Sequence, residues 1–441
     1  MRSCRPPITP KNKNREFSTT CILKSKVIKQ YIERRGMAAE QQDLPEQIAC
    51  KAQPLGISFH PSLNLLSAGL VDGSVELHNY GSSTKHRIKA LHPGASSRST
   101  NFLSDDKLLS AGSDGSIHIL DTNSMKAQLS FSKAHESPIN RTFAIHQKNL
   151  IASGDDEGVV KLWDVRSGSS CVASFENAQS DFISGFACND DGSTLLSSSG
   201  DCTLCAFDLR AATTQNTGDH SDSMGQSNSL FRRSDDQEDE LLSVVVIKNG
   251  KKVVCGTQEG ILCVWSWGTW GDQGHRMKGH PQSIDALLKV DEDTIITGSS
   301  DGLLRVVQLM PDKLLGVIGD HEGFPCEELR WSHDRRMIGS ISHDEIVRLW
   351  DVSFLIDDED EDEDVMETEN EISNMVTQNV RKTNIDVGVD SDDEWEDVDD
   401  DNNDMNSDSS DEDSDEDSFD KNPKKNVRKF MSENERFFQD L

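Results

Sequence analysis

The chain repeats one pattern of apolar and polar positions. In the clearest copy, residues 149–166, an apolar run at 150–153 is followed by a Gly- and Asp-rich segment at 154–158 and an alternating segment at 159–163. Alternation with period two is typical of a strand with one buried face, and Gly with Asp between two such runs favours a tight turn. The pattern therefore predicts two antiparallel strands joined by a turn.

Six further copies follow the same pattern, and every copy has an acid in its turn. These turn acids are Asp72, Asp114, Glu157, Asp201, Glu259, Asp301 and Asp344, spaced by 42, 43, 44, 58, 42 and 43 residues. A period in the low forties with strand–turn–strand content is typical of a β-propeller blade of four antiparallel strands. We therefore predict an all-β fold, a seven-bladed propeller that occupies residues 44–356.

A mostly bulky, apolar column lies six residues after the turn acids. It consists of His78, Leu120, Trp163, Phe207, Trp265, Val307 and Trp350. Together with the Trp-Asp pairs that begin at Trp163 and Trp350, the column resembles the WD-repeat family. The resemblance implies a buried hydrogen-bonded relay of His, Ser or Thr, an acid and Trp in each blade. The matching residues are His135, Ser153, Glu157 and Trp163 in blade three, His280, Thr297 and Asp301 in blade six, and His321, Ser340, Asp344 and Trp350 in blade seven.

These histidines could also be interpreted as catalytic bases or metal ligands. Because they recur at the blade spacing, we favour a structural role, in which buried polar groups pair with one another. The sequence contains no GxxxxGK[ST], HExxH or GxSxG motif. Its ten cysteines show neither a disulfide framework nor zinc spacing. We therefore predict a protein that is not an enzyme and has no cofactor or metal.

The last repeat lacks an outer strand, because the chain becomes acidic directly after residues 346–350. Residues 47–50 lie ahead of the first full repeat and can supply that strand. A ring closed in this way leaves only short, protected sheet edges. We expect a closed, monomeric ring.

The net charge of −33 is distributed unevenly. Residues 357–420 contain 30 acidic and 2 basic residues, whereas residues 1–36 contain 10 basic and 2 acidic residues. Such compositions predict a disordered basic extension at 1–43 and a disordered acidic tail at 357–441 that ends in a basic cluster. The ring is acidic as well, so we expect no direct binding to nucleic acid. No apolar run is long enough to span a membrane.

Two segments leave alternatives open. The basic start has features of a transit peptide, but we favour an upstream extension, with Met37 rather than Met1 as the working start. The long fourth spacing places a polar insertion at 212–240, interpreted as a tolerated surface loop in the outer region of blade four rather than a binding loop.

The acidic tail contains serines that directly precede acids and resemble casein-kinase-2 phosphorylation sites. They are Ser391, Ser410 and Ser414.

Trp163-Asp164-Val165-Arg166 and its variant Phe207-Asp208-Leu209-Arg210 carry a more specific resemblance. They resemble the box that WD-repeat substrate receptors of cullin-4 ubiquitin ligases present to the ligase adaptor. The resemblance implies that Arg166 and Arg210 dock on the adaptor and that Asp164 and Asp208 orient them through charge-assisted hydrogen bonds. The alternative is an arginine that pairs only locally at the end of its strand.

The whole layout, a divergent ring with an acidic serine-rich tail and a terminal basic cluster, looks like the family of WD-repeat-containing protein 55. That resemblance implies a scaffold of the nucleus or nucleolus, with some protein in the cytoplasm, that acts in cell-cycle and developmental control. Two functions follow from it and are not exclusive. One is a cullin-4 substrate receptor that binds the adaptor and an unknown substrate, and the other is a nucleolar factor for ribosomal RNA production.

Overall fold

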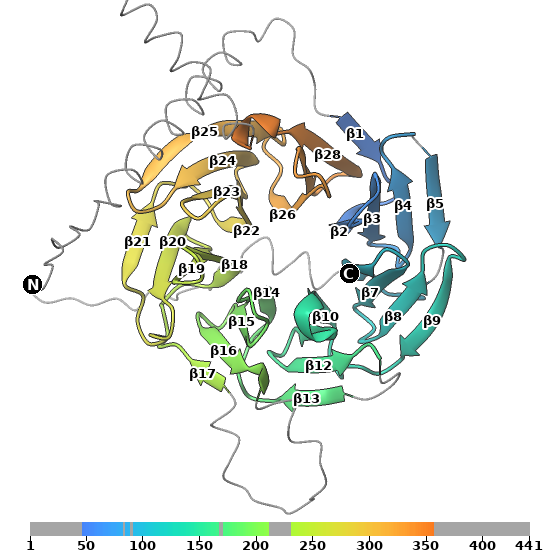
Figure 1. The fold of residues 1–441 in the computed structure, drawn as a ribbon, viewed down its shortest axis with the longest axis horizontal. Coiled ribbons are helices and arrows are strands. Elements are labelled where there is room, and N and C mark those ends of the chain that lie inside the picture. The colour runs from blue at the N-terminus through green and yellow to red at the C-terminus, as the bar shows by residue number, and fades with distance from the viewer. Residues whose placement is uncertain (1–45, 83, 89–90, 167–170, 211–230, 357–441) are drawn as a thin grey trace, which may run out of the picture. The chain divides into compact units, whose positions relative to one another are not determined.

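The computed structural model describes residues 46–356 except 83, 89–90, 167–170 and 211–230. These residues form seven four-stranded antiparallel sheets arranged as blades around a central opening (Figure 1). The predicted seven-bladed propeller is therefore confirmed. The extension at 1–43, the tail at 357–441 with Ser391, Ser410 and Ser414, and most of the predicted insertion lie outside the described residues.

Each blade runs from an inner strand to an outer strand. Blades one and two contain β2 (Pro54–Phe59), β3 (Leu65–Leu70), β4 (Val75–Asn79), β5 (Thr84–Ile88), β6 (Ser97–Ser104), β7 (Lys107–Gly112), β8 (Ile117–Asp121) and β9 (Lys126–Phe131). Blades three and four contain β10 (Ile139–Ile145), β11 (Leu150–Asp155), β12 (Val160–Asp164), β13 (Cys171–Phe175), β14 (Ile183–Cys188), β15 (Thr194–Ser199), β16 (Leu204–Asp208) and β17 (Phe231–Arg233). Blades five and six contain β18 (Leu241–Ile247), β19 (Lys252–Thr257), β20 (Ile261–Ser266), β21 (His275–Lys278), β22 (Ile284–Lys289), β23 (Thr294–Ser299), β24 (Leu303–Gln308) and β25 (Lys313–Asp320).

Blade seven combines both ends of the described chain. It contains β26 (Cys326–Trp331), β27 (Met337–Ser342), β28 (Ile346–Asp351) and, as its outer strand, β1 (Glu46–Ala49). β1 pairs antiparallel with β28, with Glu46 opposite Leu349 and Ala49 opposite Ile346. The predicted closing strand at 47–50 is therefore present and shifted by one residue.

The hydrophobic core lies between neighbouring blades. At the seam where the ring closes, Ile57 and Leu66 of blade one pack with Ile341 and Val347 of blade seven, and all four are buried. Similar clusters combine residues of adjacent blades elsewhere in the ring. Each blade is thus stabilised by burying apolar surface against its neighbours, which makes a complete circle favourable.

A β-bulge recurs near the start of the inner strand in all seven blades. The shifts in register lie between Pro54 and Gly56, Ser97 and Ser99, Ile139 and Arg141, Ile183 and Gly185, Leu241 and Ser243, Ile284 and Ala286, and Cys326 and Glu328. A bulge places one extra residue in a strand and turns its side chain away from the regular alternation. The extra residue of blade two, Arg98, forms an ion pair of 2.8 Å with Asp156 in blade three.

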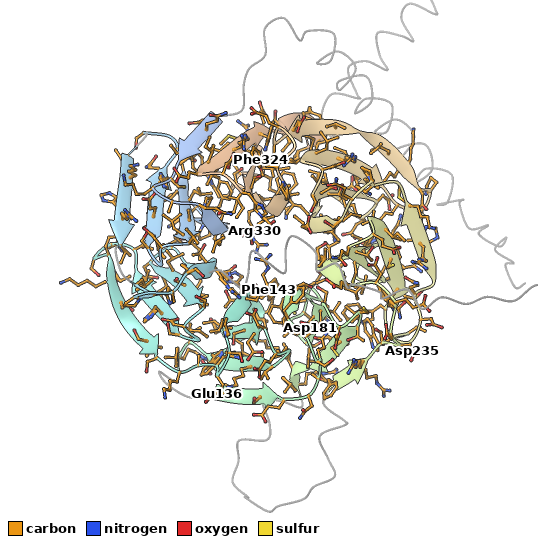
Figure 2. The ribbon with its side chains drawn as sticks, turned by 180° about the vertical axis from the view of Figure 1, so that it is seen from behind. Glu136, Phe143, Asp181, Asp235, Phe324 and Arg330 are labelled. Carbon is orange, nitrogen blue, oxygen red and sulfur yellow. The ribbon has the colours of Figure 1, made fainter. Side chains whose placement is uncertain are left out.

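The inner strands also line a narrow central hollow of about 70 Å³. Phe143 and Arg330 lie beside the opening (Figure 2). Asp285 and Glu327, two of the bulged residues, bring negative charge to the same lining. Burial raises the pKa of Asp285 to about 7, and the neighbouring Glu327 contributes to the increase.

Blade four differs from the predicted loop at 212–240. Residues Phe231–Arg233 of that segment form β17, the outer strand of the blade. The backbone N–H of Leu204 donates to Ser234 Oγ (2.9 Å), and Ser234, Gln237 and Asp239 are buried. The described part of the segment therefore packs on the blade instead of forming a surface loop.

Outside the strands, the described residues contain the short 3₁₀ turns η1 (His146–Lys148) and η3 (Ser353–Leu355). Nowhere in the described ranges does a helix have the length and apolar character needed to cross a membrane.

Candidate functional site

The relay of blade seven joins the four predicted residues through one that was not predicted. Ser340 Oγ lies 2.7 Å from His321 Nε2 and accepts a hydrogen bond of 2.7 Å from Trp350 Nε1. The other nitrogen of the imidazole accepts from Arg348 Nη1 (2.8 Å), and the same Nη1 donates to Asp344 Oδ2 (2.6 Å). Burial lowers the pKa of His321 to about 4, and the nearby Arg348 adds to this effect. The imidazole is therefore a neutral, structural group.

Blade six repeats this arrangement with two differences. His280 Nε2 bonds to Thr297 Oγ1 at 2.8 Å, while Asp301 is paired with Arg305 through a hydrogen bond of 2.9 Å. Val307 stands at the Trp position and has no side-chain N–H group to donate. Burial and the charge of Arg305 lower the pKa of His280 to about 4. The acid contacts the arginine, as in blade seven, but the relay is shorter here because the buried His280 Nδ1 has no hydrogen-bond partner.

In blade three the acid of the relay is Asp155 and not the predicted Glu157. His135 bonds to Ser153 Oγ (2.6 Å) and to Asp155 Oδ2 (2.8 Å), and Trp163 Nε1 donates to Ser153 Oγ (2.8 Å). Glu157, the residue we assigned to the relay, is exposed. Asp155 takes its place because it ends β11 and lies inside the blade, whereas Glu157 lies in the turn beyond it.

Blade two contains a relay that the sequence prediction missed. His92 bonds to Ser110 Oγ (2.8 Å) and to Asp114 Oδ1 (3.0 Å), although Leu120 occupies the Trp position. The spacing of 22 residues between His92 and Asp114 could have revealed it, since His280–Asp301 and His321–Asp344 have nearly the same spacing.

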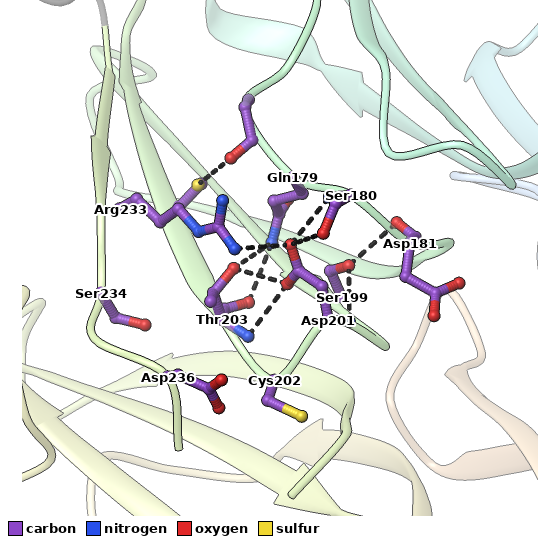
Figure 3. A network of polar contacts seen from close by, with 12 residues as sticks. Gln179, Ser180, Asp181, Ser199, Asp201, Cys202, Thr203, Arg233, Ser234 and Asp236 are labelled. Carbon is purple, nitrogen blue, oxygen red and sulfur yellow. Dashed lines mark hydrogen bonds and ion pairs between the residues drawn. The ribbon is translucent and has the colours of Figure 1, made fainter. Parts of the chain in front are cut away.

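In blade four a glutamine takes the histidine's position. Gln179 Nε2 donates to the Thr203 carbonyl (2.8 Å), and Thr203 Oγ1 donates to Asp201 (2.6 Å), within the polar network of Figure 3. Arg233 of β17 reaches the same carboxylate at 3.1 Å. These contacts connect the inner turn of the blade with its outer strand, so the network stabilises the blade.

The two predicted docking boxes have the same geometry in adjacent blades. The Arg166 backbone N–H donates to Asp164 Oδ1 (2.8 Å), its Nε to the same oxygen (3.1 Å) and its Nη2 to Oδ2 (2.9 Å). Arg210 makes the same three bonds to Asp208 at 3.0, 3.0 and 2.8 Å. These bonds raise the pKa of both guanidinium groups, which are therefore charged at any physiological pH.

The six box residues fall into two groups. The Arg166 and Arg210 side chains are each 69% exposed, and each follows the end of the third strand of its blade. Trp163 and Phe207, in contrast, are buried in the core and have no surface to offer a partner. The two aromatic residues of the boxes therefore anchor the strands that carry the arginines, and docking of the boxes on the adaptor stays a prediction.

The acid of the box has an architectural role of its own. Asn79, Asp121 and Asp351 stand at the same position in blades one, two and seven and accept the same backbone hydrogen bond from the residue two positions later. Among the described residues, only blades three and four place an arginine at that later position. The guanidinium pair, rather than the turn, is what distinguishes this part of the ring.

Seven phased blades, with a complete His–Ser–Trp relay in blades three and seven, define a WD-repeat propeller, a class of scaffold that presents surface loops to other proteins. Within this class, the family described as WDR55 matches residues 45–355, and the chain belongs to that family. It is 38% identical to WD repeat-containing protein 55 of Arabidopsis thaliana over 70% of this chain and 84% of the relative. It is 37% identical to WD repeat-containing protein JIP5 of Cryptococcus neoformans, over 70% and 82%. It is 33% identical to human WD repeat-containing protein 55, over 71% and 78%.

Proposed function

We propose that the protein is a substrate-receptor subunit of a cullin-4 ubiquitin ligase, and that it docks on the ligase adaptor through Arg166 and Arg210. The observation that supports this proposal is the repeated, exposed guanidinium–carboxylate geometry in blades three and four. Equivalent strand ends lie on the same face of a propeller, so both guanidinium groups face one side of the ring. One adaptor surface can contact both.

The ion pairs hold each arginine in place before the partner arrives. A guanidinium already fixed by its carboxylate loses less conformational freedom on binding than a free one. An exposed ion pair of this kind contributes little to the stability of the ring itself. Its removal should therefore weaken docking and leave folding unchanged.

The test compares purified wild-type protein with the double variant Arg166→Ala/Arg210→Ala for binding to the adaptor, measured by calorimetry. Arginine is a frequent hot-spot residue, so the loss of both side chains should weaken binding by at least roughly 100-fold, or about 2.7 kcal/mol. Arg336→Ala is the matched control, because Arg336 is exposed on the β26–β27 turn in the distant blade seven. This control should bind like the wild type.

Circular dichroism and melting temperature establish that each variant is folded. Undiminished binding by a folded double variant would refute the proposed docking surface. Equal weakening by Arg336→Ala would point to a general charge effect instead.

A second function, in ribosomal RNA production in the nucleus or nucleolus, is favoured by the charge layout outside the ring. The 30 acids of residues 357–420 precede a basic cluster at 421–429, a composition suited to basic ribosomal partners and to a nuclear address. Depletion of the protein should then cause ribosomal RNA precursors to accumulate. Expressing the Arg166→Ala/Arg210→Ala variant in the depleted cells separates the two functions. If the role is purely ribosomal, this variant should restore normal levels of ribosomal RNA precursors. Unchanged precursor levels after depletion would exclude this second function.

A further inference from the structure

Three side chains with metal-binding chemistry converge in blade one. The Cys50 Sγ, a Glu76 carboxylate oxygen and the His78 Nε2 lie within 4.8 Å of one another, and all three residues are buried. Cys50 Sγ is 4.0 Å from His78 Nε2, which is 2.9 Å from Glu76 Oε2. Glu76 and His78 project from β4, while Cys50 directly follows the closing strand β1.

Comparison of the blades shows that these residues replace the relay. The Cys50 backbone N–H donates to the Glu345 carbonyl. In the same way, the backbone N–H groups of the relay histidines His92 and His321 donate to the carbonyls of Gly73 and Gly302. Cys50 therefore occupies the position of the relay histidine. By their distance from the turn acid, Glu76 corresponds to the relay arginine and His78 to the tryptophan of blade seven. Blade one therefore has a thiol, a carboxylate and an imidazole, which can bind a metal, at the positions where blade seven has the hydrogen-bonded side chains of its relay.

The chemistry and dimensions of this cluster suit zinc. Thiolate, imidazole and carboxylate are the three side-chain ligands of Zn²⁺, with Zn–S near 2.3 Å and Zn–N or Zn–O near 2.0–2.2 Å. Ligand atoms at the corners of such a tetrahedron lie about 3.3–3.6 Å apart. The Sγ–Nε2 and Nε2–Oε2 separations of 4.0 and 2.9 Å lie on either side of that range, and the Sγ–carboxylate separation is within 4.8 Å. Side-chain movements of up to about 1 Å would therefore bring the three atoms around one ion.

The cluster brings a buried thiol and a buried carboxylate together. The Glu76 carboxylate is shared between His78 and Arg87, whose Nε lies 3.5 Å from Oε1. A divalent cation would neutralise both the carboxylate and the thiolate and would release the thiol proton to solvent.

We propose that Cys50, Glu76 and His78 bind one zinc ion, with the fourth position taken by water or by the second oxygen of Glu76. The ion would connect the end of β1 to β4 and so join the closing strand to blade one. Zinc binding would then contribute to closure of the ring, because an ion bound only by the folded state stabilises it. The cluster of His92, Asp114 and His118 in blade two is a weaker candidate, since both ring nitrogens of His92 already belong to the relay.

The test loads the full-length, metal-free protein with zinc, removes loosely bound ions by gel filtration and measures the retained metal by mass spectrometry. One zinc ion per chain is expected for the wild type. Cys50→Ser and His78→Phe should each weaken zinc binding by at least roughly 100-fold. Phe207 stands at the position of His78 in blade four, so His78→Phe supplies a side chain that this place in a blade accepts.

The controls are Cys205→Ser, which alters another buried thiol, and His118→Gln, which alters the second cluster. Both should retain zinc.

Cobalt loading gives an independent signature, since a thiolate–cobalt absorption band should appear in the wild type and vanish in Cys50→Ser. A chelator should lower the melting temperature of the wild type and leave that of His78→Phe unchanged. Wild-type protein that retains no zinc, or Cys50→Ser that retains it equally, would overturn the proposal.

Discussion

The hydroxyl of Ser340 holds two other side chains in position. It bonds to an imidazole from the loop before the blade and accepts from an indole on the third strand, both at 2.7 Å. Ser153 makes the same pair of contacts in blade three. Because these groups are buried, removing the hydroxyl leaves the His321 Nε2 and the Trp350 Nε1 without the hydrogen bond that it provides.

Ser340→Ala should therefore lower the free energy of unfolding by about 1–3 kcal/mol, the cost of leaving buried polar groups unpaired. Chemical denaturation measures the change. Ser62→Ala, at an exposed serine, is the control and should stay within about 0.5 kcal/mol of the wild type. Equal stability of Ser340→Ala and the wild type would mean that water replaces the hydroxyl.

The histidines of blades six and seven predict a dependence of stability on pH. Their pKa is about 4 in the folded ring and near the ordinary 6.5 in the unfolded chain. Between these values the unfolded state binds more protons, so the free energy of unfolding falls as the pH falls from 6.5 to 4. Each histidine contributes up to roughly 3 kcal/mol to this loss, which is complete below both pKa values.

His280→Gln/His321→Gln removes both titrating groups, and Gln179 shows that a blade accepts glutamine at this position. Denaturation at several pH values should give a shallower slope for this variant between pH 6.5 and 4. A slope equal to that of the wild type would show that these histidines do not determine the acid sensitivity.

For the relays, the sequence predicted most of the residues that recur, with the exception of His92 in blade two, and missed the residues that vary. His, Ser or Thr and Trp return at fixed distances, so their positions were predictable. Three consecutive acids, Asp155, Asp156 and Glu157, lie at the turn of blade three, and spacing alone did not identify Asp155 as the acid of the relay. Arg305 and Arg348 are interposed in the relays, yet their sequence positions look like ordinary strand positions.

Strand β1 completes a blade whose other three strands come from the opposite end of the described chain. The sequence predicted this pairing because the last repeat had three strands where four were needed. The outer strand of blade four was harder to predict, because β17 has only three residues and lies in a polar segment that resembles a loop. Short outer strands depend on the edge that they join more than on their own pattern.

Two truncations test the role of β1. Deletion of residues 1–45 leaves β1 intact and should not change the melting temperature. Deletion of residues 1–49 removes the strand, exposes the edge of β28 and uncovers part of the seam. The free energy of unfolding should fall by on the order of 3 kcal/mol, and the free edge of β28 should promote association between molecules. Calorimetry and light scattering measure both effects, and identical behaviour of the two truncations would contradict closure by β1.

The complete ring was predictable because seven copies of one spacing determine the number of blades. Contacts between residues that lie far apart in the sequence could not be predicted in this way. Cys50 and His78 are 28 residues apart and match no metal-binding motif, so only the closed ring shows that they meet. The lining of the central hollow has the same origin, since its residues come from the inner strands of several blades.

The tail provides a prediction for the whole chain. Residues 357–420 contain 30 acids and few residues suited to burial, so deletion of 357–441 should leave the melting temperature of the ring nearly unchanged. Differential scanning calorimetry of the truncated and full-length chains measures this. A large decrease would indicate that the acidic residues pack on the propeller.

The pairing of β1 with β28 also bears on how the protein is synthesised. Glu46 leaves the ribosome about 300 residues before its partner Leu349, so the nascent chain holds an unpaired strand for most of translation. A product that stops before β28 never acquires a closed circle and keeps open strand edges at both ends. Such edges attract chaperones and promote aggregation, so a shortened polypeptide is exposed to quality control that the finished propeller escapes.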